Sequence, residues 1–111
     1  MAPRDYLTDF ELMILLAILR IGDESYGVPI AREIEHTGGR TVALAAVYAA
    51  LDRLERHGLV SSDLGEPTRE RGGRAKRYFR VTPRGLAAVR HTQRALTRLW
   101  SDVPQLQGGR V

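Results

Sequence analysis

A helix followed by a basic hairpin, between residues 42 and 85, is the feature that most constrains the fold of this chain. Residues 42–58 read VALAAVYAALDRLERHG, with apolar side chains at the period of an α-helix and a glycine at the end. A loop that reads RERGGRAKR follows over residues 69–77, and the strand pattern YFRVT closes it over residues 78–82. A helix that fits a DNA groove, followed by a hairpin with a cationic tip, is the arrangement of a winged helix-turn-helix.

The rest of the sequence predicts a mainly α-helical chain with one small β-hairpin. Thr8 and Glu11 have the spacing of a capping box, which starts a first helix, and Ser25 is in a position to cap a second one. Thr82 followed by Pro83 marks the start of the last helix. We expect helices at about residues 9–21, 26–37 and 43–57, a wing hairpin at 59–81 and a last helix at 83–103. We assign residues 1–82 to a winged helix-turn-helix DNA-binding domain, 83–103 to a dimerisation helix and 104–111 to a frayed tail.

The composition suits one basic domain. The length is 111 residues, the formal net charge is +4 and the pI is near 10.1, which favours a polyanionic partner, nucleic acid first and an anionic membrane second. The absence of cysteine excludes disulfides and thiolate chemistry and permits a reducing cytosol, so we expect a cytoplasmic protein. The apolar run at residues 12–19 is shorter than the roughly 20 residues that span a bilayer, and it predicts a core helix rather than a signal peptide.

Small side chains line the expected recognition helix. Ala45 and Ala49 are too short to hydrogen-bond to a base, but they let the backbone sit deep in the major groove and contact thymine methyl groups. The same alanines also suit a helix that packs against a neighbour, and this alternative stays open. The candidate DNA contacts are Tyr26, Arg40, Thr41, Ala45, Tyr48, Ala49, Arg53, Arg71, Gly72, Gly73, Arg74, Lys76 and Arg77.

Tyr48 and the wing are candidates for contacts to the DNA backbone. Tyr48 lies beside the apolar stripe of its helix, so its hydroxyl can point outward to a phosphate, although a half-buried structural tyrosine has the same pattern. The basic wing residues surround Gly72 and Gly73, which allow a close approach to another backbone. Glu66 and Glu70 partly neutralise the wing, so a solvated charged loop is the alternative.

Two apolar surfaces predict that the chain pairs with a second copy. The first helix is apolar around most of its circumference, which indicates burial on more than one side. The last helix has apolar residues at alternating spacings of three and four, a heptad seam with Gln93 as its one polar member. The expected interface residues are Phe10, Met13, Ile14, Ala17, Leu86, Val89, Gln93, Leu96, Trp100 and Val103.

The sequence carries no pattern of enzyme chemistry. His36, His57 and His91 show no metal-ligand spacing, and neither a nucleophile elbow nor a phosphate loop is present. We therefore expect a protein that is not an enzyme and uses no cofactor. Two other functions remain open: a winged helix that binds an acidic protein through its basic loop, and a regulator that binds metal through carboxylates and histidines at the subunit interface.

The chain resembles the PadR family of winged helix-turn-helix transcriptional regulators over roughly residues 7 to 90. The matching elements, in order and at family-like spacing, are Phe10-Glu11, Tyr26-Gly27, Val47-Tyr48 with Leu51, Leu54-Glu55, Gly58-Leu59-Val60, and Arg77-Tyr78 through Thr82 to Gly85. The family often has a serine cap where this chain has Ala43, so the third helix lacks that cap unless Thr41 replaces it. The single helix after the wing is similar to that of the family's short subgroup.

The resemblance implies a dimeric repressor on a palindromic operator, commonly released by a small ligand. It implies that Tyr48 and the basic wing residues contact the DNA backbone, and that the last helix pairs with the first helix of the partner subunit. Trp100, with Leu96 on the same seam, is then the candidate ligand site, because two copies near the dimer axis can stack a flat aromatic effector between them. A tryptophan that only fills the dimer core is the alternative. The expected partners are duplex DNA, a second copy and a small aromatic effector, with no membrane.

Overall fold

The computed structural model describes residues 6–65 and 76–107 of the chain. This part folds into four α-helices and one two-stranded antiparallel hairpin. The elements are α1 (Asp9–Ile21), α2 (Gly27–Gly38), α3 (Leu44–Arg56), β1 (Val60–Leu64), β2 (Arg77–Val81) and α4 (Pro83–Trp100), followed by a short 3₁₀ helix (Pro104–Leu106). The predicted mainly α-helical fold with a small hairpin is confirmed, and each helix begins within one residue of its predicted start.

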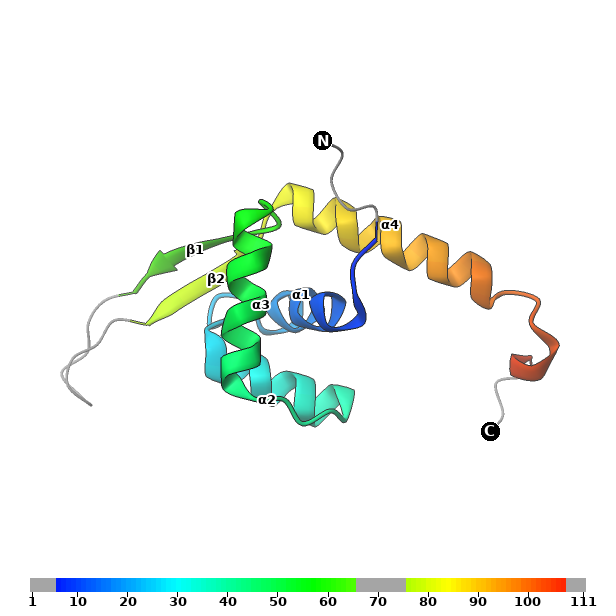
Figure 1. Ribbon diagram of the computed structural model, residues 1–111, viewed down its shortest axis with the longest axis horizontal. Helices are drawn as coiled ribbons and strands as arrows, with labels where there is room; N and C mark the ends of the chain where they lie inside the picture. The colour runs from blue at the N-terminus through cyan, green and yellow to red at the C-terminus, as the bar shows by residue number, and fades with distance from the viewer. Residues whose placement is uncertain (1–5, 66–75, 108–111) are drawn as a thin grey trace.

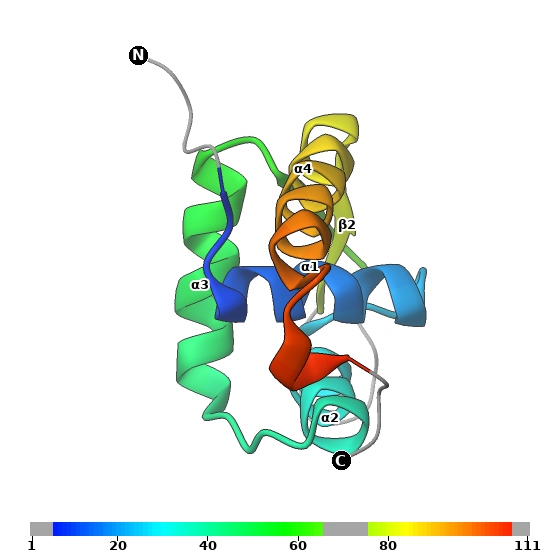
Figure 2. The same cartoon turned by 90° about the vertical axis from the view of Figure 1, so that its right-hand side faces the viewer.

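The central element is α1 (Figure 1). It lies between α4 and α2, while α3 runs along one flank of the molecule (Figure 2). The core fills the space where the first three helices meet the hairpin. Its fully buried apolar side chains are Ile14, Leu15, Ile30, Val47, Leu51, Leu54 and Val60.

Three of the predicted helix ends are confirmed in detail. Thr8 and Glu11 form the capping box at the start of α1, with each side chain accepting a hydrogen bond from the backbone N–H of the other at 2.9–3.1 Å. Thr82 caps α4 by accepting a hydrogen bond from the N–H of Gly85 at 3.0 Å. Gly58 follows α3 with a φ of 77°, a left-handed conformation that glycine adopts without strain.

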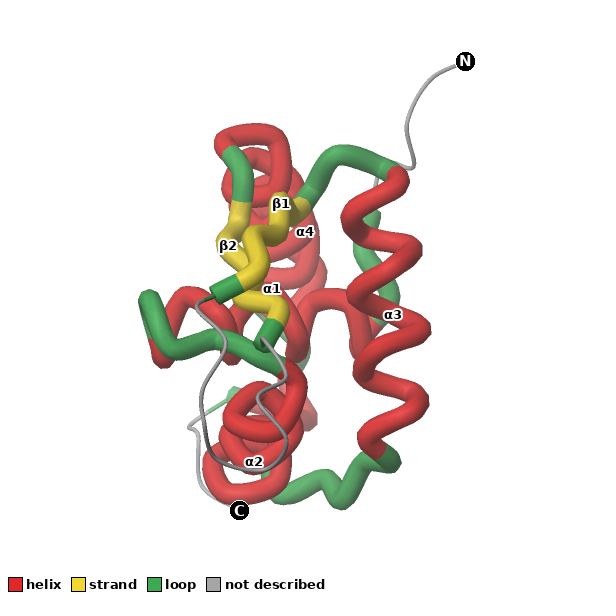
Figure 3. The backbone as a smooth tube through the Cα atoms, turned by 90° about the vertical axis from the view of Figure 1, so that its left-hand side faces the viewer, coloured by secondary structure: helices red, strands yellow, loops and turns green. Residues whose placement is uncertain are grey.

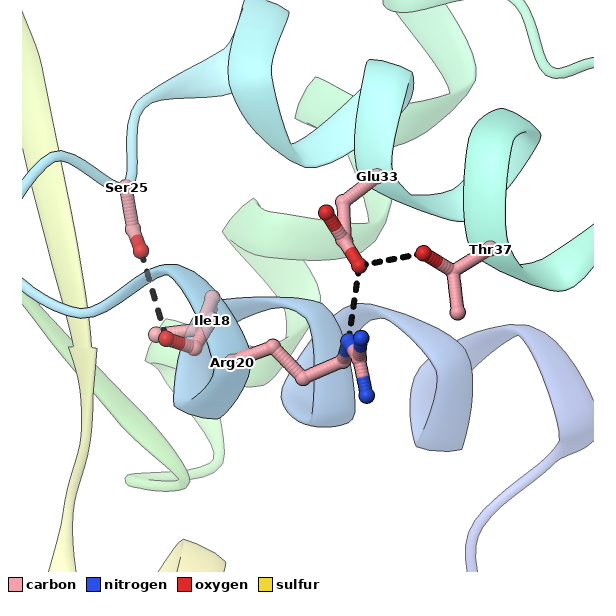
Figure 4. Close-up of polar contacts among 5 residues, drawn as sticks. All are labelled: Ile18, Arg20, Ser25, Glu33 and Thr37. Carbon is pink, nitrogen blue, oxygen red and sulfur yellow. Dashed lines mark hydrogen bonds and ion pairs between the residues drawn. The ribbon is translucent and has the colours of Figure 1, made fainter.

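Ser25 does not cap α2, contrary to the prediction. The N-cap of α2 is Tyr26, whose side chain makes no capping hydrogen bond. The Ser25 hydroxyl instead donates to the carbonyl oxygen of Gly22 at 2.7 Å and to that of Ile18 at 3.4 Å (Figure 4). Ser25 is completely buried against the end of α1, so its hydroxyl takes the acceptors that are available there.

A polar link on the surface holds α1 to α2. The Arg20 Nε donates to Glu33 Oε2 at 2.7 Å, and the Thr37 hydroxyl donates to the same oxygen at 2.6 Å (Figure 4). These two hydrogen bonds hold the pKa of Glu33 below its ordinary value, and the bond from Thr37 has the larger effect.

The hairpin is fixed to the helices at its base. Val60 pairs with Val81 and Leu64 with Arg77 across the two strands. The N–H of Phe79 donates to the Ser25 carbonyl oxygen at 2.8 Å, so β2 also pairs with the turn between α1 and α2. The hairpin therefore leaves the helical core at a defined point beside α3.

Helix α3 begins without a side-chain cap. The N-cap of α3 is Ala43, which has no side chain able to accept a hydrogen bond. Thr41 does not replace the missing cap, because no capping hydrogen bond from a side chain is made at this end. The start of α3 therefore lacks a contribution of about 1 kcal/mol that a serine or threonine cap provides.

The last helix extends away from the rest of the chain (Figure 1). Its buried residues, Gly85, Val89 and Thr92, all lie in its first ten positions. The radius of gyration is 16.1 Å, against about 13 Å for a compact domain of this length. The distal half of α4, which includes Leu96, Leu99 and Trp100, is thus largely exposed.

The structure corrects the end of the last helix. It ends at Trp100 and not at residue 103, because Ser101 is extended and Asp102 has a φ of 60°. Part of the predicted frayed tail, Pro104–Leu106, forms a 3₁₀ turn instead. None of the helices within residues 6–65 and 76–107 is long and apolar enough to cross a membrane.

Candidate nucleic-acid interface

The outer face of α3 is lined by small side chains. Ala45, Ala46 and Ala49 are exposed, whereas Val47 and Leu51 point into the core. Figure 3 shows α3 along the outer edge of the molecule, and no described segment covers the alanines. The helix therefore presents a smooth exposed surface to solvent.

Tyr48 borders this alanine face and reaches the start of α2. Its side chain keeps 41% of its surface exposed. Its ring lies so close to Gly27 that a Cβ atom built on Gly27 would overlap the Cζ and hydroxyl oxygen of the tyrosine. The hydroxyl end of Tyr48 therefore lies beside the first residue of α2, in a residue that is partly exposed.

A second tyrosine contact connects the start of α2 to the hairpin. The rings of Tyr26 and Tyr78 meet edge to face with centroids 5.5 Å apart. The ammonium group of Lys76 lies 4.7 Å from the centroid of the Tyr26 ring, a cation–π distance. Two predicted DNA contacts, Tyr26 and Lys76, are thus neighbours in space.

The two strands of the hairpin are tied to the end of α3 by a chain of hydrogen bonds. Arg77 Nη1 donates to the Ser62 hydroxyl at 2.8 Å, and that hydroxyl donates to Glu55 Oε2 at 2.7 Å. The chain fixes the orientation of Arg77, whose side chain remains exposed. The cationic residues at the base of the wing therefore have a defined position relative to the exposed helix face.

The sequence predicts a DNA contact for Arg40, but in the structure its side chain contacts the start of α1. Its Nη1 lies 3.5 Å from Asp9 Oδ2, and its guanidinium stacks 5.1 Å from the centroid of the Phe10 ring. These contacts direct Arg40 toward the start of α1. Thr41 and Arg53, in contrast, are exposed as a groove contact requires.

Four predicted DNA contacts lie outside the described residues. They are Arg71, Gly72, Gly73 and Arg74, at the expected tip of the wing. The described part of the candidate interface therefore consists of the α3 face, Tyr48, and the tyrosine and basic residues at the base of the hairpin.

A separate apolar groove lies between α1 and α4. Its volume is about 470 Å³, and its apolar lining consists of three leucines, a valine and a tryptophan, beside three polar residues. Trp100 is 66% exposed and Leu99 is 74% exposed, values that are high for large apolar side chains. The groove lining is Leu12, Leu16, Val89, Gln93, Leu96, Thr97, Trp100 and Ser101.

The structure divides the ten predicted interface residues into three groups. Ile14, Ala17 and Val89 are buried within the chain, so they have almost no surface to offer a second subunit, and we assign them to the core instead. Gln93, Leu96 and Trp100 are exposed on the distal part of α4. The remaining four, Phe10, Met13, Leu86 and Val103, are half-buried, and of these Phe10 and Met13 pack against the core.

Sequence reasoning missed three members of the apolar surface. Leu12 and Leu16 are one turn apart on α1 and line the groove, and Leu99 is among the most exposed apolar residues of α4. The spacing of Leu12 and Leu16 could have identified them as a stripe on one face of the helix. Among the described residues, no three histidine or carboxylate side chains gather in a position to hold a metal ion.

Comparison with known proteins identifies the family. Residues 15–91 match the model of the transcriptional regulator PadR-like family. The transcriptional regulator Rv3488 of Mycobacterium tuberculosis is 37% identical over 81 residues, which are 73% of this chain and 71% of that protein.

Solved structures share the fold. A transcriptional regulator from Clostridium thermocellum superposes with a TM-score of 0.69 at 25% identity, over 88% of this chain and 90% of that one. A PadR-like transcriptional regulator from Bacillus cereus has the same TM-score at 22% identity, over 91% and 93% of the two chains. The chain belongs to the PadR-like family of transcriptional regulators.

Proposed function

We propose that this chain is a homodimeric repressor that binds duplex DNA at a palindromic operator and responds to a small ligand. The observation that carries the DNA-binding part is the exposed alanine face of α3, bordered by Tyr48. A helix with small side chains on its outer face can enter the major groove closely, and its methyl groups can contact those of thymine.

Backbone contacts would come from the residues around that face. The hydroxyl of Tyr48 and the cationic groups of Lys76 and Arg77 are suited to phosphate oxygens, which bind without reading sequence. Arg53 and Thr41 are the exposed polar residues that can read base edges. Arg40 joins them only if its exposed pair with Asp9 opens, and such a pair contributes little energy.

The apolar groove and the distal half of α4 support a homodimer. A monomer would leave Leu96, Leu99 and Trp100 in water, although large exposed apolar patches are rare on soluble monomers. In the proposed dimer, α4 and the exposed stripe of α1 pack against a second copy. The two α3 helices then enter successive major grooves, with half-sites about 34–36 Å apart.

Trp100 and Leu96 are the proposed effector contacts. Both line the groove of about 470 Å³, whose size is suitable for a small aromatic compound. A planar ligand can stack on the Trp100 ring, with the gain in free energy that aromatic contacts provide. Quenching or a shift of Trp100 fluorescence across a panel of aromatic compounds would report such binding, since it is the only tryptophan.

Selection of DNA sites from a random duplex pool tests the proposed function directly. We expect an enriched palindrome with half-site centres separated by one helical turn. Footprinting on the DNA upstream of the chain's own gene then asks whether that site occurs there. A pool that yields no enrichment, together with capture of an acidic protein by the wing, would replace the repressor with a protein-interaction module.

A further inference from the structure

Gly27 is the residue whose missing side chain makes room for Tyr48. A Cβ atom at position 27 would overlap the Cζ and hydroxyl oxygen of Tyr48 and lie 2.8 Å from its Cε1. The atoms in the way are the outer end of the Tyr48 side chain, which is partly exposed and can move only by turning the whole ring. Any side chain at position 27 therefore has to displace Tyr48 or shift α2.

The backbone conformation does not explain this glycine. The described glycines with a positive φ are Gly22, Gly39 and Gly58, whereas Gly27 begins α2 with an ordinary helical conformation. Alanine would be the better helix former at such a position. The three atoms nearest to a Cβ at this position all belong to Tyr48, so space for the tyrosine accounts for the glycine.

The neighbourhood of Gly27 links three elements of the candidate interface. Tyr48 arrives from α3, and Tyr26, the residue before Gly27, contacts Tyr78 and Lys76 of the hairpin. Gly27 itself is buried. Within residues 6–65 and 76–107, no hydrogen bond holds the Tyr48 hydroxyl, so packing against the start of α2 sets the position of the ring.

We propose that Gly27 is a positioning residue for DNA binding: it lets the Tyr48 ring lie across the start of α2, where the hydroxyl is held at the surface for a phosphate. The proposal rests on the proposed DNA-binding function for the role of the hydroxyl. The placement of the ring stands on the packing alone, so the two parts can be tested separately.

A double-mutant cycle of Gly27→Ala and Tyr48→Ala separates positioning from other effects. We expect each single variant to weaken binding to the selected duplex by about tenfold, the value of one hydrogen bond to a charged group. In the Tyr48→Ala background, Gly27→Ala should cause no further loss, because the ring with which it collides is gone. Gly38→Ala is the matched control, since a Cβ there would meet only Ile34 at 4.0 Å.

Fluorine NMR of protein labelled with 3-fluorotyrosine reports on the ring without DNA. The chain has four tyrosines, and we expect Gly27→Ala to shift the Tyr48 resonance strongly while those of Tyr6 and Tyr78 stay close to their wild-type positions. Circular dichroism shows whether each variant retains its helices. A folded Gly27→Ala protein with an unchanged Tyr48 resonance would overturn the positioning role.

The DNA-binding measurements can also contradict the proposal. If Gly27→Ala weakens binding equally in the presence and absence of the Tyr48 ring, Gly27 acts through its own backbone and the proposal is wrong. If the wild-type protein binds none of the pool, the proposed function fails, and the fluorine spectrum still decides whether Gly27 sets the position of the ring.

Discussion

The backbone N–H of Leu7 donates a hydrogen bond of 3.1 Å to the hydroxyl of Thr92, 85 positions later in the chain. Thr92 is buried on α4, and beside it Tyr6 stacks on His91 with ring centroids 4.8 Å apart. We expect Thr92→Val to lower the free energy of unfolding by about 1–2 kcal/mol, because a partly buried N–H loses its acceptor while the side-chain shape is kept.

Urea unfolding of the wild type and of Thr92→Val measures this loss of stability. Thr41→Val is the control, since Thr41 is exposed and its substitution should change stability by less than about 0.5 kcal/mol. Equal stabilities of the wild type and Thr92→Val would mean that the segment before α1 contributes nothing by docking on α4.

The carboxylate of Glu33 predicts a dependence of stability on pH. Hydrogen bonds from Thr37 and Arg20 hold its pKa below the ordinary value, so the folded protein binds this proton less readily than the unfolded chain does. The contribution to stability is therefore fully present above the unfolded pKa of about 4.3 and is lost as the pH falls through the lower pKa of the folded state. We expect the stability difference between wild type and Glu33→Gln to shrink over that acid range.

Unfolding curves at neutral and acid pH give this difference. Glu35→Gln, an exposed change on the same helix, controls for the general loss of one negative charge. A difference between wild type and Glu33→Gln that stays constant from neutral to acid pH would show that the Arg20–Glu33–Thr37 link does not act through the ionised carboxylate.

The exposed leucines of α4 predict the oligomeric state. In the proposed dimer, Leu96 is covered by the second subunit, so Leu96→Asp would bury a charge and should convert a dimer to a monomer in sedimentation experiments. Leu64→Asp is the matched control: Leu64 is also exposed, but it lies at the end of β1, remote from the groove between α1 and α4. A wild-type chain that sediments as a monomer would remove the dimer from the proposed function.

Local signals in the sequence were enough to predict the elements. The capping box of Thr8 and Glu11, the glycine at position 58 and the Thr82-Pro83 pair act within a few residues, and each works as predicted. Hydrophobic periodicity then sets which face of each helix is apolar. These signals require no knowledge of what packs against the helix.

Apart from the end of α4, the failures concern packing that residue spacing does not show. Ser25 has the right spacing for a cap, but burial against α1 diverts its hydroxyl to the carbonyl of Gly22. Hydrophobic periodicity places Ile14 and Val89 on the apolar faces of their helices. It does not show whether their own chain or a second copy covers those faces. The need for glycine at position 27 is equally invisible, because Tyr48 reaches it only in the folded chain.

The wing predicts how DNA affinity depends on salt. If Lys76 neutralises a phosphate, Lys76→Ala removes one released counterion for each wing, and the slope of log affinity against log salt should flatten by about one per lost contact. A dimer has two wings, so the expected change is about two for the complex. The loss of affinity should be similar for all sequences, because phosphate contacts carry no base information.

Titrations of labelled duplex at several salt concentrations give the slopes for Lys76→Ala and for Arg90→Ala. Arg90 is also an exposed cation, but it lies on α4, outside the candidate interface, so its removal changes the net charge equally and should leave the slope nearly unchanged. If the salt slope flattens equally in both variants, the effect comes from net charge and not from a contact by Lys76. If the slope of Lys76→Ala is unchanged, Lys76 does not contact the DNA backbone.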